Sequence, residues 1–338
     1  MKITVKSKNR DYDVIINSGV LDNIEFYLDI TRNYIIVSDD NIPEYIINKF
    51  LTKLNIVKTI RFPEGETSKS LSLYSSIINS IINSNITKDV VVLAIGGGVT
   101  GDLAGFIAST LYRGVDYIQV PTTLLAQIDS SIGGKVAVNS DKVKNAIGTI
   151  YPPKLVLVDP NVLSSLSKRH FNNGMAEMIK YSLISSKSMF CKLLKDDINS
   201  LLEDLIIESI KIKKQIVEED EFDVGVRQTL NFGHTFGHAY EAYYEYKKYL
   251  HGEAVALGML QFVSEKIKSD LIALLKKFSL PIEDQVKKED LIEFIKNDKK
   301  AKMDSINIIK VKSIGEAYIE KIYNYETELL KWILLVTI

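Results

Sequence analysis

The sequence has one cysteine, no long apolar run and almost no net charge. Cys191 alone among 338 residues cannot form a disulfide framework, which is typical of a protein from a reducing compartment. The 42 Lys and Arg residues balance 43 Asp and Glu residues, so no overall field favours nucleic acid or an anionic membrane. No apolar run reaches the roughly 18 residues of a membrane span, and the first residues lack the apolar core of a secretion signal. We therefore expect a cytoplasmic protein that binds neither nucleic acid nor membrane.

The order of apolar segments predicts an α/β protein with two domains. β-branched runs at residues 34–41, 89–98, 115–123 and 154–160 alternate with helical patterns, which is typical of a mainly parallel sheet. The N-terminal segment predicts a hairpin around Asn9 and Arg10. After about residue 167 the strand signal fades, and residues 174–219 and 235–276 carry helical spacing of Ile, Leu and Tyr. The boundary between the two predicted domains therefore lies near residue 167.

The segment GGGVTG, residues 96–101, follows a predicted strand and precedes a helix predicted over residues 102–112. Glycines there allow backbone N–H groups to approach a pyrophosphate, and the helix dipole favours the same anion. A tight turn without a ligand is the alternative interpretation. The acidic residue expected about 20 positions later should close a strand and hold the ribose, but Asp116 opens its strand. Asp39 closes an earlier strand, so we predict a dinucleotide site with a non-standard strand order, and Asp102 is a candidate N-cap.

A polar segment at residues 121–148 follows the end of the third predicted strand, where open α/β sheets bind ligands. Its IGGK sequence resembles part of a P-loop but lacks the required spacing, which argues against an ATPase. Lys135 and Lys144 are candidates for neutralising an anionic substrate group such as phosphate. The alternative is that both are solvated loop lysines.

Three of the four histidines lie between residues 234 and 251. His234 and His238 are four residues apart and would share one face of a helix, whereas His251 follows thirteen residues later. A metal site would need a further donor, and Glu177 in NGMAEMIKY is a candidate, with Lys180 one helical turn beyond it. Three histidine ligands, or two ligands and one acid/base, both fit this spacing. Hydrogen-bonded core histidines are the alternative without a metal.

Seven segments, in this order and spacing, resemble the 3-dehydroquinate synthase family over Asp39 to Gly315. They are SDDN, PEGETSKSL, GGGVTGDLAGFIAS, YRGVDYIQVPTTLLAQIDSSIGGKVAVN, NGMAEMIKY, RQTLNFGHTFGHA and HGEAVALGM. The resemblance implies a Rossmann-like NAD-binding domain at residues 1–166 and a mostly α-helical metal- and substrate-binding domain at residues 167–338, with the site between them. It also implies a lyase of the shikimate pathway that converts 3-deoxy-D-arabino-heptulosonate 7-phosphate to 3-dehydroquinate and phosphate. The implied course is transient oxidation by NAD, β-elimination, reduction and intramolecular aldol closure.

The resemblance also implies roles for individual residues. Zn²⁺, or Co²⁺ in its place, would be bound by Glu177, His234 and His251, and His238 would transfer a proton. NAD would contact Asp39, Asn41, Glu66, Lys69, Gly97, Gly98, Val99, Asp102, Thr122, Thr123, Asp129 and Lys144. The sugar phosphate would contact Asp129, Lys135, Lys144, Asn145, Lys180, Lys213, Arg227, Leu230, Asn231, His234, His238, His251, one of Lys299 or Lys300, and Arg113 from the second subunit of a homodimer. The catalytic residues would be His238, Lys180, Lys135, Asn145 and Arg227.

Within these roles, Lys135, Lys144 and Asn145 would surround the phosphate, and Lys213 and Arg227 would face the carboxylate. A carboxylate subsite argues against other sugar phosphate cyclases whose substrates lack that group. A phosphate subsite argues against a net oxidoreductase such as glycerol dehydrogenase. A non-catalytic metal-binding protein is the remaining alternative.

Two segments depart from the family pattern. Before the metal glutamate the family usually has Leu-Pro-x-Arg-Glu, but this chain has LSKRH, with Ser167 for proline and His170 for glutamate. In DEFDVGVR, Phe222 stands where a basic residue is common. Neither change touches a predicted metal ligand, so we expect altered affinity and retained activity.

Overall fold

The computed structural model describes residues 1–140, 143–298 and 305–323, and the chain folds into two compact units. Unit 1 comprises Met1–Ser167 with Leu202–Glu221, and unit 2 comprises Lys168–Leu201 with Phe222–Ile338. The predicted α/β class is confirmed. The first segment of unit 1 ends at Ser167, and residues 202–221 also group with unit 1, so the two predicted domains, residues 1–166 and 167–338, stay a prediction. Lys299 and Lys300, the candidate substrate lysines, lie outside the described residues.

Unit 1 is built on a seven-stranded sheet in which only the first pair of strands is antiparallel. The strands lie in the order β1 (Lys2–Val5), β2 (Tyr12–Ile16), β9 (Leu155–Val158), β6 (Tyr117–Pro121), β5 (Val91–Gly96), β3 (Asn33–Asp39) and β4 (Asn55–Phe62). The N-terminal hairpin and all four predicted strands are therefore confirmed. The prediction missed β4, an edge strand whose sequence NIVKTIRF alternates apolar and polar residues without a long apolar run.

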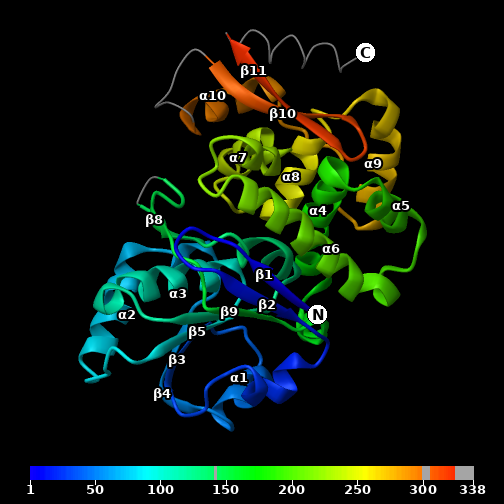
Figure 1. Cartoon of the computed structure of the whole chain (residues 1–338). Coiled ribbons are helices and arrows are strands. Elements are labelled where there is room, and N and C mark those ends of the chain that lie inside the picture. The colour runs from blue at the N-terminus through cyan, green and yellow to red at the C-terminus, as the bar shows by residue number, and fades with distance from the viewer. Residues whose placement is uncertain (141–142, 299–304, 324–338) are drawn as a thin grey trace. The chain divides into compact units, whose positions relative to one another are not determined.

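Helices cover both faces of the sheet, as Figure 1 shows. On β3, Tyr34 and Ile36 point into one core with α1 (Glu44–Leu51), whereas Ile35 and Val37 point into another with α2 (Leu71–Ile82) and α3 (Gly98–Thr110). Strands buried on both faces read as continuous apolar runs, which is why these strands were visible in the sequence.

The strand order places a ligand-binding position at the ends of β3 and β5. From β3 the chain crosses to β4 on one side, and from β5 it crosses to β6 on the other. Open α/β sheets bind ligands outside the carboxyl ends of the strands at such a switch point. Asp39 ends β3 and Gly97 follows β5, so the two predicted nucleotide segments meet there. The predicted non-standard strand order is confirmed.

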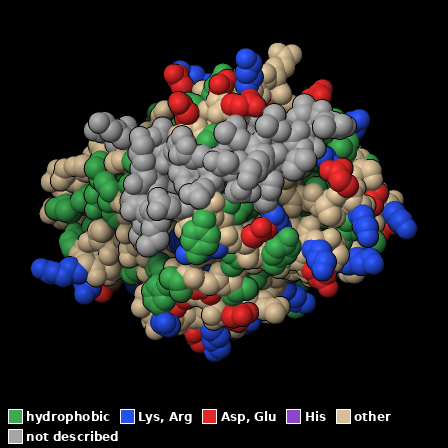
Figure 2. All heavy atoms as spheres, turned by 90° about the horizontal axis from the view of Figure 1, so that it is seen from above, with side chains coloured by type: hydrophobic (Ala, Val, Ile, Leu, Met, Phe, Trp, Pro, Cys, Tyr) green, Lys and Arg blue, Asp and Glu red, His purple; other side chains and the backbone are tan. Residues whose placement is uncertain are grey.

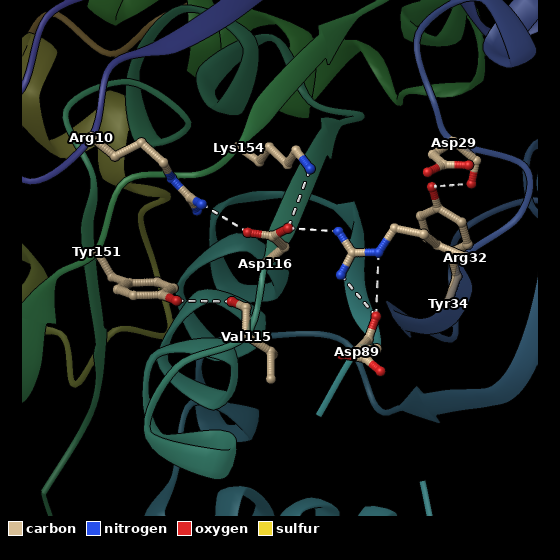
Figure 3. A network of polar contacts seen from close by, with 9 residues as sticks. All are labelled: Arg10, Asp29, Arg32, Tyr34, Asp89, Val115, Asp116, Tyr151 and Lys154. Atoms are coloured by element: carbon tan, nitrogen blue, oxygen red, sulfur yellow. Dashed lines mark hydrogen bonds and ion pairs between the residues drawn. The ribbon is translucent and has the colours of Figure 1, made fainter. Parts of the chain in front are cut away.

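Asp116 serves a structural role at the opposite, amino-terminal end of the sheet (Figure 3). Its two carboxylate oxygens lie 2.7 Å from Nη1 of Arg10 and 2.7 Å from Nη1 of Arg32, and Lys154 Nζ is 3.3 Å away. Burial alone would raise the pKa of Asp116, but the hydrogen bonds from Arg32 and Arg10 hold that pKa well below its usual range. The residue that fails the ribose-binding pattern thus joins the N-terminal hairpin to β6.

The polar segment after β6 is more regular than expected. Residues Ala126–Ser130 form a π-helical turn, and β7 (Lys135–Val138) pairs antiparallel with β8 (Ile147–Ile150). The remaining short helices of unit 1 are η1 (Val20–Phe26), η2 (Glu66–Ser68), η3 (Leu111–Arg113) and η5 (Pro160–Ser165). A predicted loop-rich segment is therefore mostly a turn and a hairpin.

Unit 2 is mostly helical, as predicted for residues 174–219 and 235–276. Its helices are α4 (Lys168–Ser185), α5 (Lys187–Lys195), η6 (Val226–Asn231), α7 (His234–Tyr243), α8 (His251–Met259), α9 (Glu265–Lys277) and α10 (Lys288–Asp298). Every residue of α4 from Asn172 to Ile184 is buried, so α4 is the central helix of this unit.

A hairpin of β10 (Ser305–Ser313) and β11 (Glu316–Tyr323) completes the described part of unit 2 and was not predicted. An isolated two-stranded hairpin is marginally stable in water, so its formation depends on support from elsewhere. Gly315 in its turn has φ 91° and donates its N–H to the Leu183 carbonyl of α4 at 2.8 Å. This contact is invisible to local periodicity.

Helix α6 (Ile198–Glu219) belongs to unit 2 at its start and to unit 1 over most of its length. Near the start of the unit 1 part, Glu203 accepts hydrogen bonds from the Ser18 N–H at 3.0 Å and the Ser18 hydroxyl at 2.6 Å. Near its end, Glu218 accepts from the Lys6 N–H at 2.6 Å. These contacts with the N-terminal segment explain why residues 202–221 group with unit 1.

The surface shows mixed charge. On the described part of the face seen in Figure 2, Lys and Arg side chains are interspersed with Asp and Glu side chains. Within residues 1–140, 143–298 and 305–323, no helix has the length and hydropathy needed to cross a membrane.

Candidate active site

Three helices of unit 2 bring Glu177, His234 and His251 together. Glu177 is fully buried in α4, while His234 and His251 are the first residues of α7 and α8. The Nε2 atoms of His234 and His251 lie 3.8 Å and 3.6 Å from Oε1 of Glu177. One potential ligand atom from each residue lies within 4.8 Å of the others. The structure thus brings together the residues that were predicted to bind metal.

Close helix packing through two glycines makes this cluster possible. A Cβ atom on Gly252 would lie 2.0 Å from the Asn173 carbonyl oxygen, so only glycine lets α8 approach α4 this closely. The Gly252 N–H donates to Oδ1 of Asn173 at 2.6 Å. A Cβ atom on Gly258 would lie 1.9 Å from the Gly233 carbonyl oxygen just before α7. These contacts place the start of α8 beside Glu177 and the start of α7.

Both imidazoles are oriented through their Nδ1 atoms. Nδ1 of His234 lies 3.1 Å from the Phe232 carbonyl oxygen, and Nδ1 of His251 lies 3.4 Å from Oε2 of Glu241. With the Nδ1 protons donated to these oxygens, the Nε2 lone pairs face Glu177. A carbonyl or carboxylate behind each ring is the usual arrangement of metal-ligating histidines.

Glu241 is a buried residue of this site that was not among the predicted residues. It lies seven residues after His234 on α7, which puts both side chains on the same helix face two turns apart. That spacing was the signal available in the sequence.

The charges at the cluster are those of a metal site. Neither carboxylate oxygen of Glu177 has a hydrogen-bond partner among the described residues, although the buried Lys180 ammonium forms an ion pair with it. Burial lowers the pKa of His234 well below its usual range, with a further contribution from Lys180, so its imidazole is neutral. Burial also acts to lower the pKa of His251, but the Glu241 carboxylate raises it overall. A divalent cation would satisfy the buried Glu177 oxygens, so these residues fit a metal.

His238 lies beside the Glu177 group and is not part of it. It is one turn after His234 on α7, and its ring centroid is 5.4 Å from that of His234 and 6.1 Å from that of His251. The predicted shared helix face of His234 and His238 is confirmed. His238, Glu241 and His251 also have potential ligand atoms within 4.8 Å of one another. In that group, Nδ1 of His251 lies 3.4 Å from Oε2 of Glu241.

Apart from the three histidines on α7 and α8, the described predicted substrate residues of unit 2 lie on α4 and η6. Lys180 is on α4, while Arg227, Leu230 and Asn231 belong to η6, which leads into α7. Lys180 and Arg227 are 2% and 3% exposed, and buried cations of this kind are expected to have anionic partners. Their roles toward a substrate stay predictions.

In unit 1, Asp39 is joined to the glycine-rich turn by Thr100. The Thr100 hydroxyl donates to Oδ2 of Asp39 at 2.9 Å, and the Asn41 N–H donates to Oδ1 at 3.2 Å. A Cβ atom on Gly96 would lie 2.3 Å from the Thr100 hydroxyl oxygen, so glycine is required at position 96. Thr100 was not among the predicted residues, although it is the threonine of GGGVTG.

Helix α3 begins at Gly98, four residues earlier than predicted. Gly97 is its N-cap, and no side chain caps this helix end. Its first N–H groups are therefore oriented as a phosphate-binding helix end requires. The interpretation of Asp102 as an N-cap is wrong, because Asp102 lies inside the helix.

Asp102 belongs instead to a polar network of predicted cofactor and substrate residues. Lys69, which is 4% exposed, lies with Nζ 2.7 Å from Oδ2 of Asp102 and also donates to the Asn145 side chain. Burial raises the pKa of Asp102, and Lys69 opposes that rise. Asn139, which was not predicted, links the two sides by accepting from the Asn145 N–H at 2.8 Å and donating to Oε1 of Glu66 at 2.8 Å.

Asp129 and Lys213 form a second contact between predicted residues of unit 1. Lys213 on α6 forms an ion pair with the Asp129 carboxylate and donates to the Asp129 carbonyl oxygen at 2.7 Å. Asp129 lies in the π-helical turn, an element that is frequent at functional sites.

The remaining predicted residues of unit 1 lie at the end of β6 and on the β7–β8 hairpin. Thr122 and Thr123 follow β6, and a Cβ atom on Gly97 would lie 3.1 Å from the Thr123 methyl group. Lys135 opens β7, whereas Lys144 and Asn145 lie in the turn at the other end of the hairpin. The predicted phosphate-binding residues are thus separated along the hairpin, and a shared role for them stays a prediction.

Comparison with known proteins agrees with this geometry. Residues 59–173 match the family model described as 3-dehydroquinate synthase N-terminal, and residues 174–301 match 3-dehydroquinate synthase C-terminal. The chain is 40% identical over 342 residues to a curated 3-dehydroquinate synthase from Clostridium kluyveri, with 95% of each chain covered. It is 39% identical over 344 residues to that of Streptococcus gordonii, covering 95% of this chain and 97% of the relative. The chain belongs to the 3-dehydroquinate synthase family.

Solved structures of two sugar phosphate cyclases resemble the chain over nearly its whole length. A 2-deoxy-scyllo-inosose synthase solved with carbaglucose-6-phosphate, NAD⁺ and Co²⁺ has a TM-score of 0.86 at 26% identity and covers 98% of this chain and 99% of its own. A 2-epi-5-epi-valiolone synthase from Streptomyces hygroscopicus, solved with NAD⁺ and Zn²⁺, has a TM-score of 0.85 at 25% identity and covers 97% and 98%.

Membership of the 3-dehydroquinate synthase family confirms the predicted activity over its alternatives. The curated relatives at about 40% identity carry this activity, whereas the two other cyclases are near 25%. A probable glycerol dehydrogenase from Sinorhizobium meliloti, with a TM-score of 0.56 at 17% identity, shares the fold alone.

The two departures from the pattern of the 3-dehydroquinate synthase family lie outside the cluster of Glu177, His234 and His251. Ser167, His170 and Phe222 are all exposed. Arg169, beside His170, makes a forked contact with Glu253 of α8 at 2.7 Å and 2.8 Å. The retained arginine therefore still links α4 to α8 although the glutamate of the pattern is replaced.

Proposed function

We propose that this 3-dehydroquinate synthase chain requires NAD and a divalent metal bound by Glu177, His234 and His251. The observation that carries the metal proposal is the buried Glu177 carboxylate, which has an ion pair with Lys180 but no hydrogen-bond partner among the described residues, and which faces two Nε2 atoms. The similar cyclases solved with NAD⁺ and either Co²⁺ or Zn²⁺ support a requirement for NAD and a divalent metal. Nitrogen and carboxylate ligands suit both ions, and zinc is our first choice.

A metal held by these residues supplies Lewis-acid chemistry, which lowers the pKa of a coordinated alcohol. His238 lies next to both histidine ligands and takes up or returns the alcohol proton as an acid/base group. Arg227 binds the substrate carboxylate as a fork, while Lys180 and Lys213 act as point charges. Lys135, Lys144 and Asn145 bind the phosphate that leaves.

NAD supplies reversible hydride acceptance, and unit 1 supplies its binding position. Asp39 accepts hydrogen bonds from the ribose hydroxyls, and the uncapped N-terminus of α3 binds the pyrophosphate. Lys69, Asp102 and Glu66 hold the network beside that helix end in place.

Phosphate release from 3-deoxy-D-arabino-heptulosonate 7-phosphate tests the proposal. With zinc and a small amount of NAD⁺, we expect many turnovers per NAD⁺ and no accumulation of NADH, because the cofactor is regenerated in each cycle. Treatment with a chelator should abolish release, and added Zn²⁺ or Co²⁺ should restore it. Glucose 6-phosphate, which lacks a carboxylate, should not react. Stoichiometric NADH formation or indifference to the chelator would contradict the proposal.

NAD⁺ should bind more tightly than NADP⁺. The 2′-phosphate of NADP⁺ would lie against the Asp39 carboxylate, and the repulsion disfavours it. Calorimetric titration of the wild type and of Asp39→Ser checks this, because the variant should lose most of its preference. Equal affinity of the wild type for both cofactors would refute this role of Asp39.

We further propose a homodimer in which Arg113 binds the phosphate at the partner's active site. Tyr112 and Arg113 have φ values of 51° and 65°, and the Tyr112 hydroxyl donates to the Ile86 carbonyl at 2.6 Å. Two successive left-handed residues outside glycine are costly, and such conformations concentrate at functional sites. This turn is therefore a suitable position for a residue that must project from its own subunit.

Mixed dimers test the shared site. Arg113→Ala and His234→Ala should each be nearly inactive. After subunit exchange in an equal mixture, about half of the dimers combine both variants and contain one intact site, so about a quarter of wild-type turnover should return. A mixture of Glu177→Gln with His234→Ala is the matched control and should stay inactive. Glu177 and His234 of one chain belong to the same site, so each site of a mixed dimer still carries one of the two changes. A fully active monomer, or no recovery in the first mixture, would disprove the shared site.

A further inference from the structure

The loop between α7 and α8, residues 244–250, joins the helices that carry His234 and His251. Asp284, in the segment between α9 and α10, holds this loop from one side, and its side chain is 0% exposed. Oδ1 of Asp284 accepts from the Tyr244 hydroxyl at 2.8 Å and the Val286 N–H at 2.8 Å. Oδ2 accepts from Lys248 Nζ at 2.6 Å and the Tyr249 hydroxyl at 2.5 Å. One carboxylate thus binds three side chains of the loop.

The charges and rings around Asp284 stabilise the same arrangement. Burial acts to raise the pKa of Asp284, but hydrogen bonds from Lys248 and Tyr249 lower it to about 2. Nζ of Lys248 lies 4.1 Å and 4.8 Å from the ring centroids of Tyr244 and Tyr249, within cation–π range. The carboxylate is therefore ionised at neutral pH, and each of its two oxygens accepts two hydrogen bonds.

The loop backbone needs such support. Glu245 and Tyr246 have φ values of 51° and 60°, so two successive residues with side chains adopt the left-handed conformation. This conformation is unfavourable for residues other than glycine and persists only where surrounding contacts determine it. The contacts of Asp284 with Tyr244 on one side and with Lys248 and Tyr249 on the other enclose this strained pair.

The other side of the loop is held from α4, the helix that carries Glu177. Nη2 of Arg169 donates to the Lys248 carbonyl at 2.9 Å, and Glu253 accepts from the Leu250 N–H at 2.8 Å while binding Arg169. The residue that follows Leu250 is His251. The loop is therefore held from two directions immediately before the histidine.

We propose that Asp284 is a positioning residue of the metal site, which fixes the loop so that Nε2 of His251 faces Glu177. Its hydrogen-bond partners among the described residues are Val286 and three residues of the loop, and it acts through Lys248 and Tyr249, three and two positions before His251. The inference rests on the proposed metal-binding role of Glu177, His234 and His251.

Asp284→Asn tests the proposal because the amide keeps the shape of the side chain but loses the charge and one acceptor. We expect the dissociation constant for Zn²⁺, measured by competition with a chelating dye, to rise about 10–100-fold, the usual effect of losing a group that orients a ligand. Phosphate release should be low at limiting zinc and return close to wild type at saturating zinc. Glu283→Gln, which removes the exposed carboxylate directly before Asp284, is the matched control. It should leave both the zinc affinity and phosphate release unchanged.

Tyr249→Phe is a milder second variant that keeps the ring and loses one hydrogen bond to Asp284. It should weaken zinc binding in the same direction by a smaller factor, which keeps the test decisive if Asp284→Asn folds poorly. A lower Tm with unchanged zinc affinity in both variants would overturn the proposal, since Asp284 would then only stabilise the fold. An equal loss of affinity in Glu283→Gln would also overturn it. Failure of the wild type to bind zinc would refute the proposed metal site itself.

Discussion

His234→Ala should lose the bound metal and lower turnover by about 10³-fold or more. His234 supplies one of three ligands, and a metal contributes several kcal/mol of transition-state stabilisation, with about 1.4 kcal/mol for each factor of ten. The fully buried Glu177 would keep only His251 and the Lys180 ion pair beside it. Elemental analysis of the purified protein and steady-state phosphate release measure the two effects.

His170→Ala is the matched control for this variant, since His170 is exposed and is the one histidine that lies outside residues 234–251 of the sequence. It should keep both metal and turnover. Full metal occupancy in His234→Ala would show that the donor set has been assigned incorrectly, and equal losses in both variants would point to a general effect on folding.

His238→Asn should keep its metal and lower turnover by roughly 10²–10⁴-fold, the usual contribution of a positioned acid/base group. His238 is near both histidine ligands but does not belong to the group formed with Glu177. Asparagine can still form hydrogen bonds at this position but cannot carry a proton at neutral pH. Metal content and phosphate release, measured on the same preparation, distinguish a role in metal binding from a role in proton transfer.

Three outcomes of the His238→Asn experiment separate three roles. Retained metal with slow turnover identifies a proton carrier. Loss of metal would identify His238 as a ligand, in line with its alternative group with Glu241 and His251. Unchanged turnover would leave His238 as a packed helix residue, and His170→Asn is the control for the substitution itself.

The main strands, the glycine-rich turn and the order of the functional segments could be predicted from local sequence patterns. The strands β3, β5, β6 and β9 are buried on both faces or nearly so, and such strands appear as local apolar runs. Residues one or two turns apart on a helix share a face, so the pairing of Glu177 with Lys180 and of His234 with His238 was also predictable. Each of these features depends on residues close together in the chain.

Contacts between residues far apart in the chain could not be predicted in this way, because they depend on how the elements pack. Glu241 faces His251 across the α7–α8 turn, Thr100 reaches Asp39 from another element, and Asn139 joins Glu66 to Asn145. Asp116 looked like a failed ribose ligand until its partners Arg10 and Arg32 appeared at the amino-terminal end of the sheet.

The same limit applies to whole elements. The β10–β11 hairpin depends on α4, and residues 202–221, most of which belong to α6, join unit 1 through contacts with the first eighteen residues of the chain. Asp102 was misplaced because α3 begins at Gly98, where the glycine-rich turn packs closely against Thr123 and Ser130. Local periodicity reports which face of an element is apolar, but the partner of that face is set by packing between segments far apart in the chain, which propensity does not encode.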